Sequence, residues 1–270
     1  MKTPYHWADL TWPEIGAASR DQRTVVVVPV GSIEQHGLHL PVRTDSMIVG
    51  EIAERAVRTA VAETPVLLAP TITIGCSEHH MEFPGPLTLS DETFVRAVTE
   101  VGMSIIRHGF RRIFFLNGHG GNEAPLQLVV NELRRQAGGR VMCATASYWR
   151  FIREEVQEIR RSEMGGISHS CEFETSAVLA IDPSQVDMSK AKKFLPNWSN
   201  GYFMPGWYVP SKVNLGFHLK DITKTGVVGD PTVATKESGD RFLEAAVTAV
   251  AGFLRLFSGW EFGNLYEERK

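Results

Sequence analysis

The chain has 270 residues and a mass of 30.0 kDa, a size that suits one large α/β domain better than two small ones. With 43% hydrophobic residues, 22% charged residues and a net charge of −3, it lacks the basic excess of proteins that bind nucleic acid or anionic membranes. It has no signal-peptide core and no uninterrupted apolar run of membrane-spanning length, and its three cysteines form no CxxC motif. We therefore expect a soluble, cytoplasmic protein that binds neither nucleic acid nor membrane.

Strand-like and helix-like segments alternate along the chain. In chain order, the residue pattern predicts strands at 25–30, 66–74, 112–116 and 140–147, and between them helices at 45–62, 90–107 and 122–136. Further helices are expected at 148–161, 172–181 and 232–257. This alternation predicts a single three-layer α/β/α domain over residues 1–270, with a largely parallel sheet that binds ligands at the carboxyl ends of its strands.

Residues 194–230 interrupt the regular pattern. They are rich in glycine, proline and aromatic side chains, among them Trp198, Trp207 and Tyr208. A long segment without periodicity is usually functional or disordered, and the aromatic content argues against disorder. We expect this aromatic-rich segment to cover the site or to lie at a subunit contact.

Polar side chains gather in three segments that follow predicted strands. These segments are GSIEQHGLHLPVRTD (31–45), RIFFLNGHGGNE (112–123) and ISHSCEFETS (167–176). In an extended chain Glu34 and His36 point to the same side, and Asp45 returns to the same edge of the sheet at the start of the next helix. A lone histidine is more often structural than a ligand, and GHGGN alone could be an anion-binding turn. The gathering of imidazoles and carboxylates at one edge instead favours a site for Zn, Mn or Fe.

The same segments resemble the ordered signatures of the creatininase family of metal-dependent amidohydrolases. The resemblance runs from about residue 6 to 255 and also includes WADLTWPE, GCSEHHMEFPGPLTL and GVVGDPTVAT. It implies two divalent metal ions per chain (Zn, Mn or Fe), a small-molecule substrate and a homo-oligomer such as a hexamer. The metal ligands that it implies are Glu34, His36, Asp45 and His119, with Asp45 as the bridge between the ions.

One ligand position departs from the family pattern. In creatininase itself a tyrosine and a glutamate follow the histidine of the NGH motif, and that glutamate is a further ligand. Here Gly120 and Gly121 stand in their place, which leaves a ligand position vacant and weakens the case for creatinine as substrate.

We expect Glu172 to fill the vacant position, because its place in HSCEFETS resembles the HAGExETS of other branches of the family. Residues two apart on a helix point about 200° away from each other, so Glu172 and Glu174 do not share a face. Glu174 belongs to an apolar stripe with Ala177 and Val178, which predicts that it is buried and orients a ligand or a turn instead.

The resemblance also implies the remaining roles at the site. His169 is expected to donate a proton to the leaving nitrogen, and Ser77, Gly120 and Trp149 are expected to contact the substrate. The roles of His39, His79 and His80 stay open.

The expected reaction is hydrolysis of a small non-peptide amide, cyclic amide or formamide by metal-activated water. Alternatives within the family are a creatinine amidohydrolase proper, a formamidopyrimidine-type deformylase and a peptidase-like maturation enzyme. Outside it, a non-catalytic metal- or ligand-binding α/β protein and a phosphate-binding module remain open.

Overall fold

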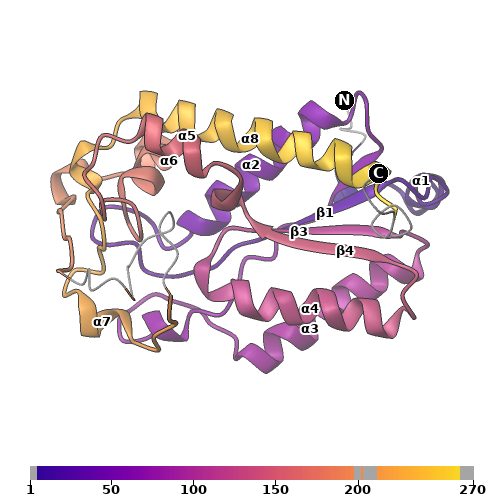
Figure 1. Ribbon diagram of the computed structural model, residues 1–270, viewed down its shortest axis with the longest axis horizontal. Helices are drawn as coiled ribbons and strands as arrows, with labels where there is room; N and C mark the ends of the chain where they lie inside the picture. The colour runs from indigo at the N-terminus through magenta and orange to yellow at the C-terminus, as the bar shows by residue number, and fades with distance from the viewer. Residues whose placement is uncertain (1–4, 198–201, 203–211, 262–270) are drawn as a thin grey trace, which may run out of the picture.

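The valine-rich run that precedes the first motif forms one of the two central strands of a four-stranded parallel sheet (Figure 1). The computed structural model describes residues 5–197, 202 and 212–261. The strands lie in the order β2-β1-β3-β4 and pair in parallel throughout. Their bounds are β1 (Val25–Val30), β2 (Val66–Leu68), β3 (Arg112–Asn117) and β4 (Met142–Ser147).

Helices cover both faces of the sheet (Figure 1). One layer contains α1 (Trp12–Ala18), α3 (Asp91–Arg107) and α4 (Glu123–Gln136). The other layer contains α2 (Thr44–Ala60), α5 (Arg153–Ile159), α6 (Glu172–Ile181) and α8 (Lys236–Gly259). The short helix α7 (Leu219–Ile222) lies beyond the sheet, at the end opposite to α1.

The side-chain alternation of β1 explains the two layers. Val25 and Val27 pack into the core beneath α2 and α8, whereas Val26 and Val28 pack into the core beneath α3 and α4. Because both faces are buried, the strand reads as a continuous apolar run rather than as an alternating one. The expected three-layer α/β/α fold with a parallel sheet is confirmed.

Several predicted boundaries are wrong. The strand expected at 66–74 ends at Leu68, shortly before Pro70, which has no N–H for the ladder; beyond it only Ile72 bridges to Val30. The helix expected at 148–161 is divided into a 3₁₀ turn, Tyr148–Phe151, and α5. The last helix starts at Lys236 instead of residue 232, because Thr235 caps it by accepting the Ser238 N–H.

Helix α8 is long and apolar enough to cross a membrane by length and composition alone. Half of its most apolar stretch is buried, and the helix packs against α2 and α6 in the core. We therefore assign α8 as a core helix of the domain.

Helices α6 and α8 pack with their backbones in close contact at Gly239. A Cβ at this position would lie 1.8 Å from the backbone oxygen of Ser176, which cannot move without shifting α6. Gly239→Ala is therefore expected to destabilise the fold by about 1–3 kcal/mol or more, as measured by urea unfolding.

Gly252 provides the matched control in the same helix. A Cβ there would meet no described atom within 4 Å, so Gly252→Ala is expected to stabilise the protein by about 0.5–1 kcal/mol. Equal tolerance of the two substitutions would show that the helices do not touch at Gly239.

Candidate metal centre

The residues of the first motif meet the end of β3 at the carboxyl edge of the sheet. Glu34 and His36 lie in the loop after β1, Asp45 is in the first turn of α2, and His119 follows β3. The four side chains are buried, with between 1% and 3% of each residue exposed. A cluster of ionisable groups buried to this degree needs compensating partners.

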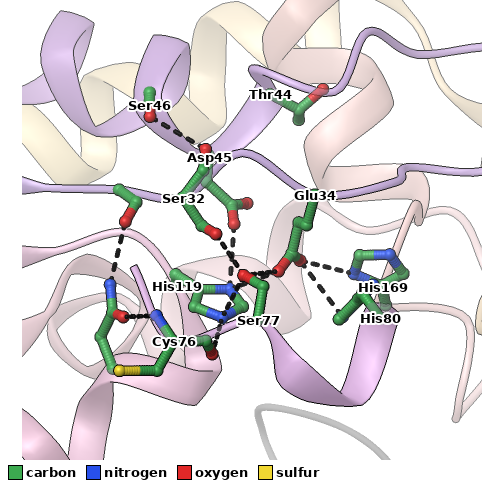
Figure 2. Close-up of polar contacts among 12 residues, drawn as sticks. Ser32, Glu34, Thr44, Asp45, Ser46, Cys76, Ser77, His80, His119 and His169 are labelled. Atoms are coloured by element: carbon green, nitrogen blue, oxygen red, sulfur yellow. Dashed lines mark hydrogen bonds and ion pairs between the residues drawn. The ribbon is translucent and has the colours of Figure 1, made fainter. Parts of the chain in front are cut away.

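The two oxygens of Asp45 face different imidazoles. Asp45 Oδ1 lies 3.1 Å from His36 Nε2, and Asp45 Oδ2 lies 3.0 Å from His119 Nδ1. Glu34 Oε2 lies 3.0 Å from the same nitrogen of His119. Figure 2 shows the carboxylates of Glu34 and Asp45 converging on His119. The placement of the two Asp45 oxygens against different imidazoles is the arrangement expected of a carboxylate that bridges two cations.

Backbone carbonyls orient both imidazoles. The Nδ1 of His36 lies 3.3 Å from the Glu34 carbonyl, and the Nε2 of His119 lies 3.0 Å from the Cys76 carbonyl. Since a carbonyl only accepts, these ring nitrogens carry an N–H, and the opposite nitrogens face the carboxylates. Among the described residues, the buried His36 Nε2 and Asp45 Oδ2 have no partner with hydrogen-bond geometry. Buried atoms of this kind fit a metal ion.

The second carboxylate oxygen of Glu34 faces two further histidines, His80 and His169. Glu34 Oε1 lies 3.4 Å from His80 Nε2 and 3.6 Å from His169 Nδ1 (Figure 2). The other nitrogen of His169, Nε2, lies 2.8 Å from the Gln35 backbone carbonyl and 3.0 Å from the Gln35 side-chain amide nitrogen. The shorter contact, to a carbonyl that only accepts, places the N–H on Nε2 and leaves Nδ1 as the acceptor. The Gln35 amide lies 3.1 Å from His80 Nδ1. Gln35 thus orients both histidines.

Glu172 was expected at the site and Glu174 away from it, but the structure places the two glutamates the other way round. Both oxygens of Glu172 accept backbone N–H groups, from Arg161 at 2.7 Å and from Ser162 at 2.8 Å, so this carboxylate faces away from the cluster. Glu174 Oε1 instead lies 3.5 Å from His36 Nε2, and Glu174 groups with His36 and Asp45. The structure therefore brings Glu174, and not Glu172, to the site.

Without a metal ion, the carboxylates stabilise positive imidazoles. Burial lowers the pKa of His119, but Glu34 and Asp45 outweigh it and raise that pKa to about 10. Burial also lowers the pKa of His36, but the carboxylates of Asp45 and Glu174 outweigh burial and hold that pKa well above its ordinary value. Burial lowers the pKa values of His80 and His169 well below the ordinary range, and nearby histidines add to the effect.

A cavity of about 870 Å³ opens onto this cluster. Its lining includes His119, His169 and Glu174, and also Gly120 and Trp149, two of the expected substrate contacts. It also includes residues 214–217 and Leu219 from the aromatic-rich segment. The expected aromatic residues Trp198, Trp207 and Tyr208 lie outside the described residues.

The structure places Ser77, one of the expected substrate contacts, against Glu34. The Ser77 hydroxyl is fully buried, donates to Glu34 Oε2 at 3.0 Å and also bonds to the Ser32 hydroxyl. Ser77 therefore holds the Glu34 carboxylate in place through a hydrogen bond. It is not among the described residues that line the cavity.

Two buried amides that sequence reasoning missed hold the loops of the site together. Asn117 accepts the backbone N–H of His119 at 3.1 Å and donates to its carbonyl at 2.6 Å. Asn122 accepts the Cys76 N–H at 2.9 Å and donates to the Gly31 carbonyl at 3.0 Å. A polar residue at each end of the glycine turn NGHGGN was the available signal.

Asn122→Ala is expected to destabilise the protein by about 2–4 kcal/mol, because it leaves the buried Cys76 N–H and Gly31 carbonyl without partners. Urea unfolding of the metal-free protein measures the effect. Asn131→Ala, an exposed change in α4, is the control and should shift stability by less than about 0.5 kcal/mol. Equal effects at both positions would contradict the role of Asn122 as a link between three loops.

This chain is similar to known proteins in sequence and in fold. The family model for creatininase, described as creatinine amidohydrolase, matches residues 8–254. The chain is 31% identical to the mycofactocin precursor peptide peptidase of Mycobacterium tuberculosis, over 92% of each chain. It is 27% identical to creatinine amidohydrolase of Pseudomonas putida, over 92% of this chain and 95% of that protein.

The solved structures agree. A mutant creatininase of the Zn-Zn type superposes with a TM-score of 0.80 at 25% identity, over 95% of this chain and 98% of that chain. The match to the family model over almost the entire chain, together with a relative at 31% identity, shows that this chain belongs to the creatininase family of hydrolases.

Proposed function

We propose that this chain holds two divalent metal ions and hydrolyses a C–N bond in a small non-peptide amide, cyclic amide or formamide. The observation that carries the proposal is the buried Asp45, whose two oxygens face His36 and His119 separately. Glu34 and His119 would hold one ion together with Asp45, and His36 and Glu174 would hold the other. When bound, such ions acidify a water molecule and polarise a carbonyl group.

His169 is the proposed proton carrier. Its Nε2–H is fixed on the Gln35 carbonyl, and its Nδ1 faces the site 3.6 Å from Glu34 Oε1. Because burial lowers its pKa, the ring is neutral near pH 7, so that Nδ1 can accept a proton and pass it to the leaving nitrogen.

A second candidate function is cleavage of a longer, peptide-like substrate. The 870 Å³ cavity adjoins another of about 530 Å³, and the two share His79, Asp91, Gly121, Gly216 and Phe217. This additional space could take the flanking residues of a peptide, which agrees with the similarity to a precursor peptide peptidase.

Two measurements test the proposal. Elemental analysis of the purified protein should find about two ions per chain from among Zn, Mn and Fe, the types of ion that suit this ligand set. A panel of amides, lactams, formamides and short peptides should then reveal hydrolysis that a chelator abolishes and added metal restores. Two bound ions without hydrolysis of any compound would favour a non-catalytic binding protein, and absence of metal would overturn the proposal.

We also propose a cytoplasmic location. Within the described part of the chain Cys76, Cys143 and Cys171 are unpaired, which supports a reducing compartment such as the cytoplasm. We further propose a homo-oligomer, which light scattering during size-exclusion chromatography would detect as a mass that is a multiple of 30.0 kDa.

A further inference from the structure

We infer that His79 is an additional metal ligand, on the Glu34 and His119 side of the centre. The inference rests on the proposed two-metal function. His79 lies in the 3₁₀ turn Glu78–His80, and it offers a ring nitrogen within 4.8 Å of ligand atoms of Glu34 and His119. These three residues come from three different loops at the carboxyl edge of the sheet.

Position 121 cannot supply a ligand in this chain. A Cβ on Gly121 would lie 2.1 Å from the backbone oxygen of Cys76 and 2.5 Å from His119 Nε2. It would also lie 3.0 Å from Cε1 of His79. The space next to the glycine turn is therefore already filled, in part by the imidazole of His79.

The neighbouring histidines differ in what their ring nitrogens do. Both nitrogens of His80 have partners, because Nδ1 lies against the Gln35 amide and Nε2 against Glu34. Among the described residues no hydrogen bond or ion pair engages the ring of His79, which lies nearly parallel to the ring of His119 at 5.6 Å between centroids. His79 lines both adjoining cavities. Its nitrogens are thus available at the centre, whereas those of His80 are committed to its neighbours.

The two halves of the centre would then differ chemically. With Asp45 shared between them, one half would contain the imidazoles of His79 and His119 with the carboxylate of Glu34. The other half would contain one imidazole, that of His36, with the carboxylate of Glu174. Because imidazole suits Zn and carboxylates suit Mn, the half that contains His79 should prefer Zn.

The test measures metal binding directly. In the full-length protein, His79→Ala should lower the bound Zn from about two ions per chain to about one, or weaken one of the two Zn affinities by at least about 10–100-fold. His79→Phe keeps a ring beside His119 but removes the ligand nitrogens, and it should give the same loss. Millimolar imidazole should restore the second ion in the Ala variant but not in the Phe variant.

His218→Ala is the control, because His218 lines the 530 Å³ cavity but belongs to none of the described ligand groups. It should bind both ions like the unmodified protein. Circular dichroism and thermal unfolding in chelator confirm that each variant is folded. Two ions bound with unchanged affinity in both His79 variants would overturn this inference alone, whereas an unmodified protein that binds no metal would overturn the proposed function with it.

Discussion

Glu174→Gln is expected to remove one of the two proposed ions and to slow hydrolysis by about 10²–10³-fold or more, the range found when one electrostatic catalytic group is lost. The reason is the position of Glu174 Oε1, 3.5 Å from His36 Nε2 at the edge of the cavity. A glutamine there keeps the shape of the side chain but not the charge that a divalent ion needs. Elemental analysis and turnover of whichever compound the panel identifies would measure both effects.

Glu172→Gln is the matched control two residues earlier in the same helix. Because Glu172 accepts the backbone N–H groups of Arg161 and Ser162, this variant should retain both ions and most of the activity. It should instead lose about 1.5–3 kcal/mol of stability, the range for hydrogen bonds to a charged group. Loss of metal from Glu172→Gln with normal metal content in Glu174→Gln would reverse the assignment.

This pair shows where sequence reasoning reached its limit. The helical geometry correctly separated the two glutamates, and it correctly placed Glu174 on the buried stripe with Ala177 and Val178. It did not predict that the buried stripe also reaches the cluster of candidate ligands. The metal centre is itself buried, and the face of α6 that packs inward continues directly onto His36.

The first motif was more predictable because its geometry is local. A strand buried on both faces is visible as the run Val25–Val30, and parallel pairing brings the ends of β1 and β3 to one edge. The supporting contacts could not be foreseen in this way. Gln35, Asn122 and Ser77 act through partners that are distant in sequence, such as Gln35 with His169 and Asn122 with Gly31, and no periodic pattern encodes such pairs.

The metal-free protein is expected to be most stable near pH 6.5 and to lose stability on both sides. Burial lowers the pKa of His119, but the carboxylates of Glu34 and Asp45 outweigh burial and raise that pKa to about 10. The contribution of protonated His119 to the free energy of unfolding is therefore complete below pH 6.5 and is lost between pH 6.5 and 10. On the acid side, burial lowers the pKa values of His39 and His79 to about 4. The unfolded chain therefore binds more protons there, and stability falls from pH 6.5 toward 4.

Metal should remove the alkaline part of this profile. A bound ion requires neutral imidazoles and displaces the protons that His36 and His119 otherwise hold, so metal affinity should rise with pH while the metal-free fold weakens. At about 1.36 kcal/mol per pKa unit, the alkaline loss in chelator should be on the order of a few kcal/mol. Urea unfolding between pH 4 and 10 measures the dependence of stability on pH, once with chelator and once with Zn.

His119→Gln should reduce the loss of stability between pH 6.5 and 10 in chelator. A metal-free protein equally stable at pH 6.5 and 10 would show that the carboxylates do not hold a proton on His119.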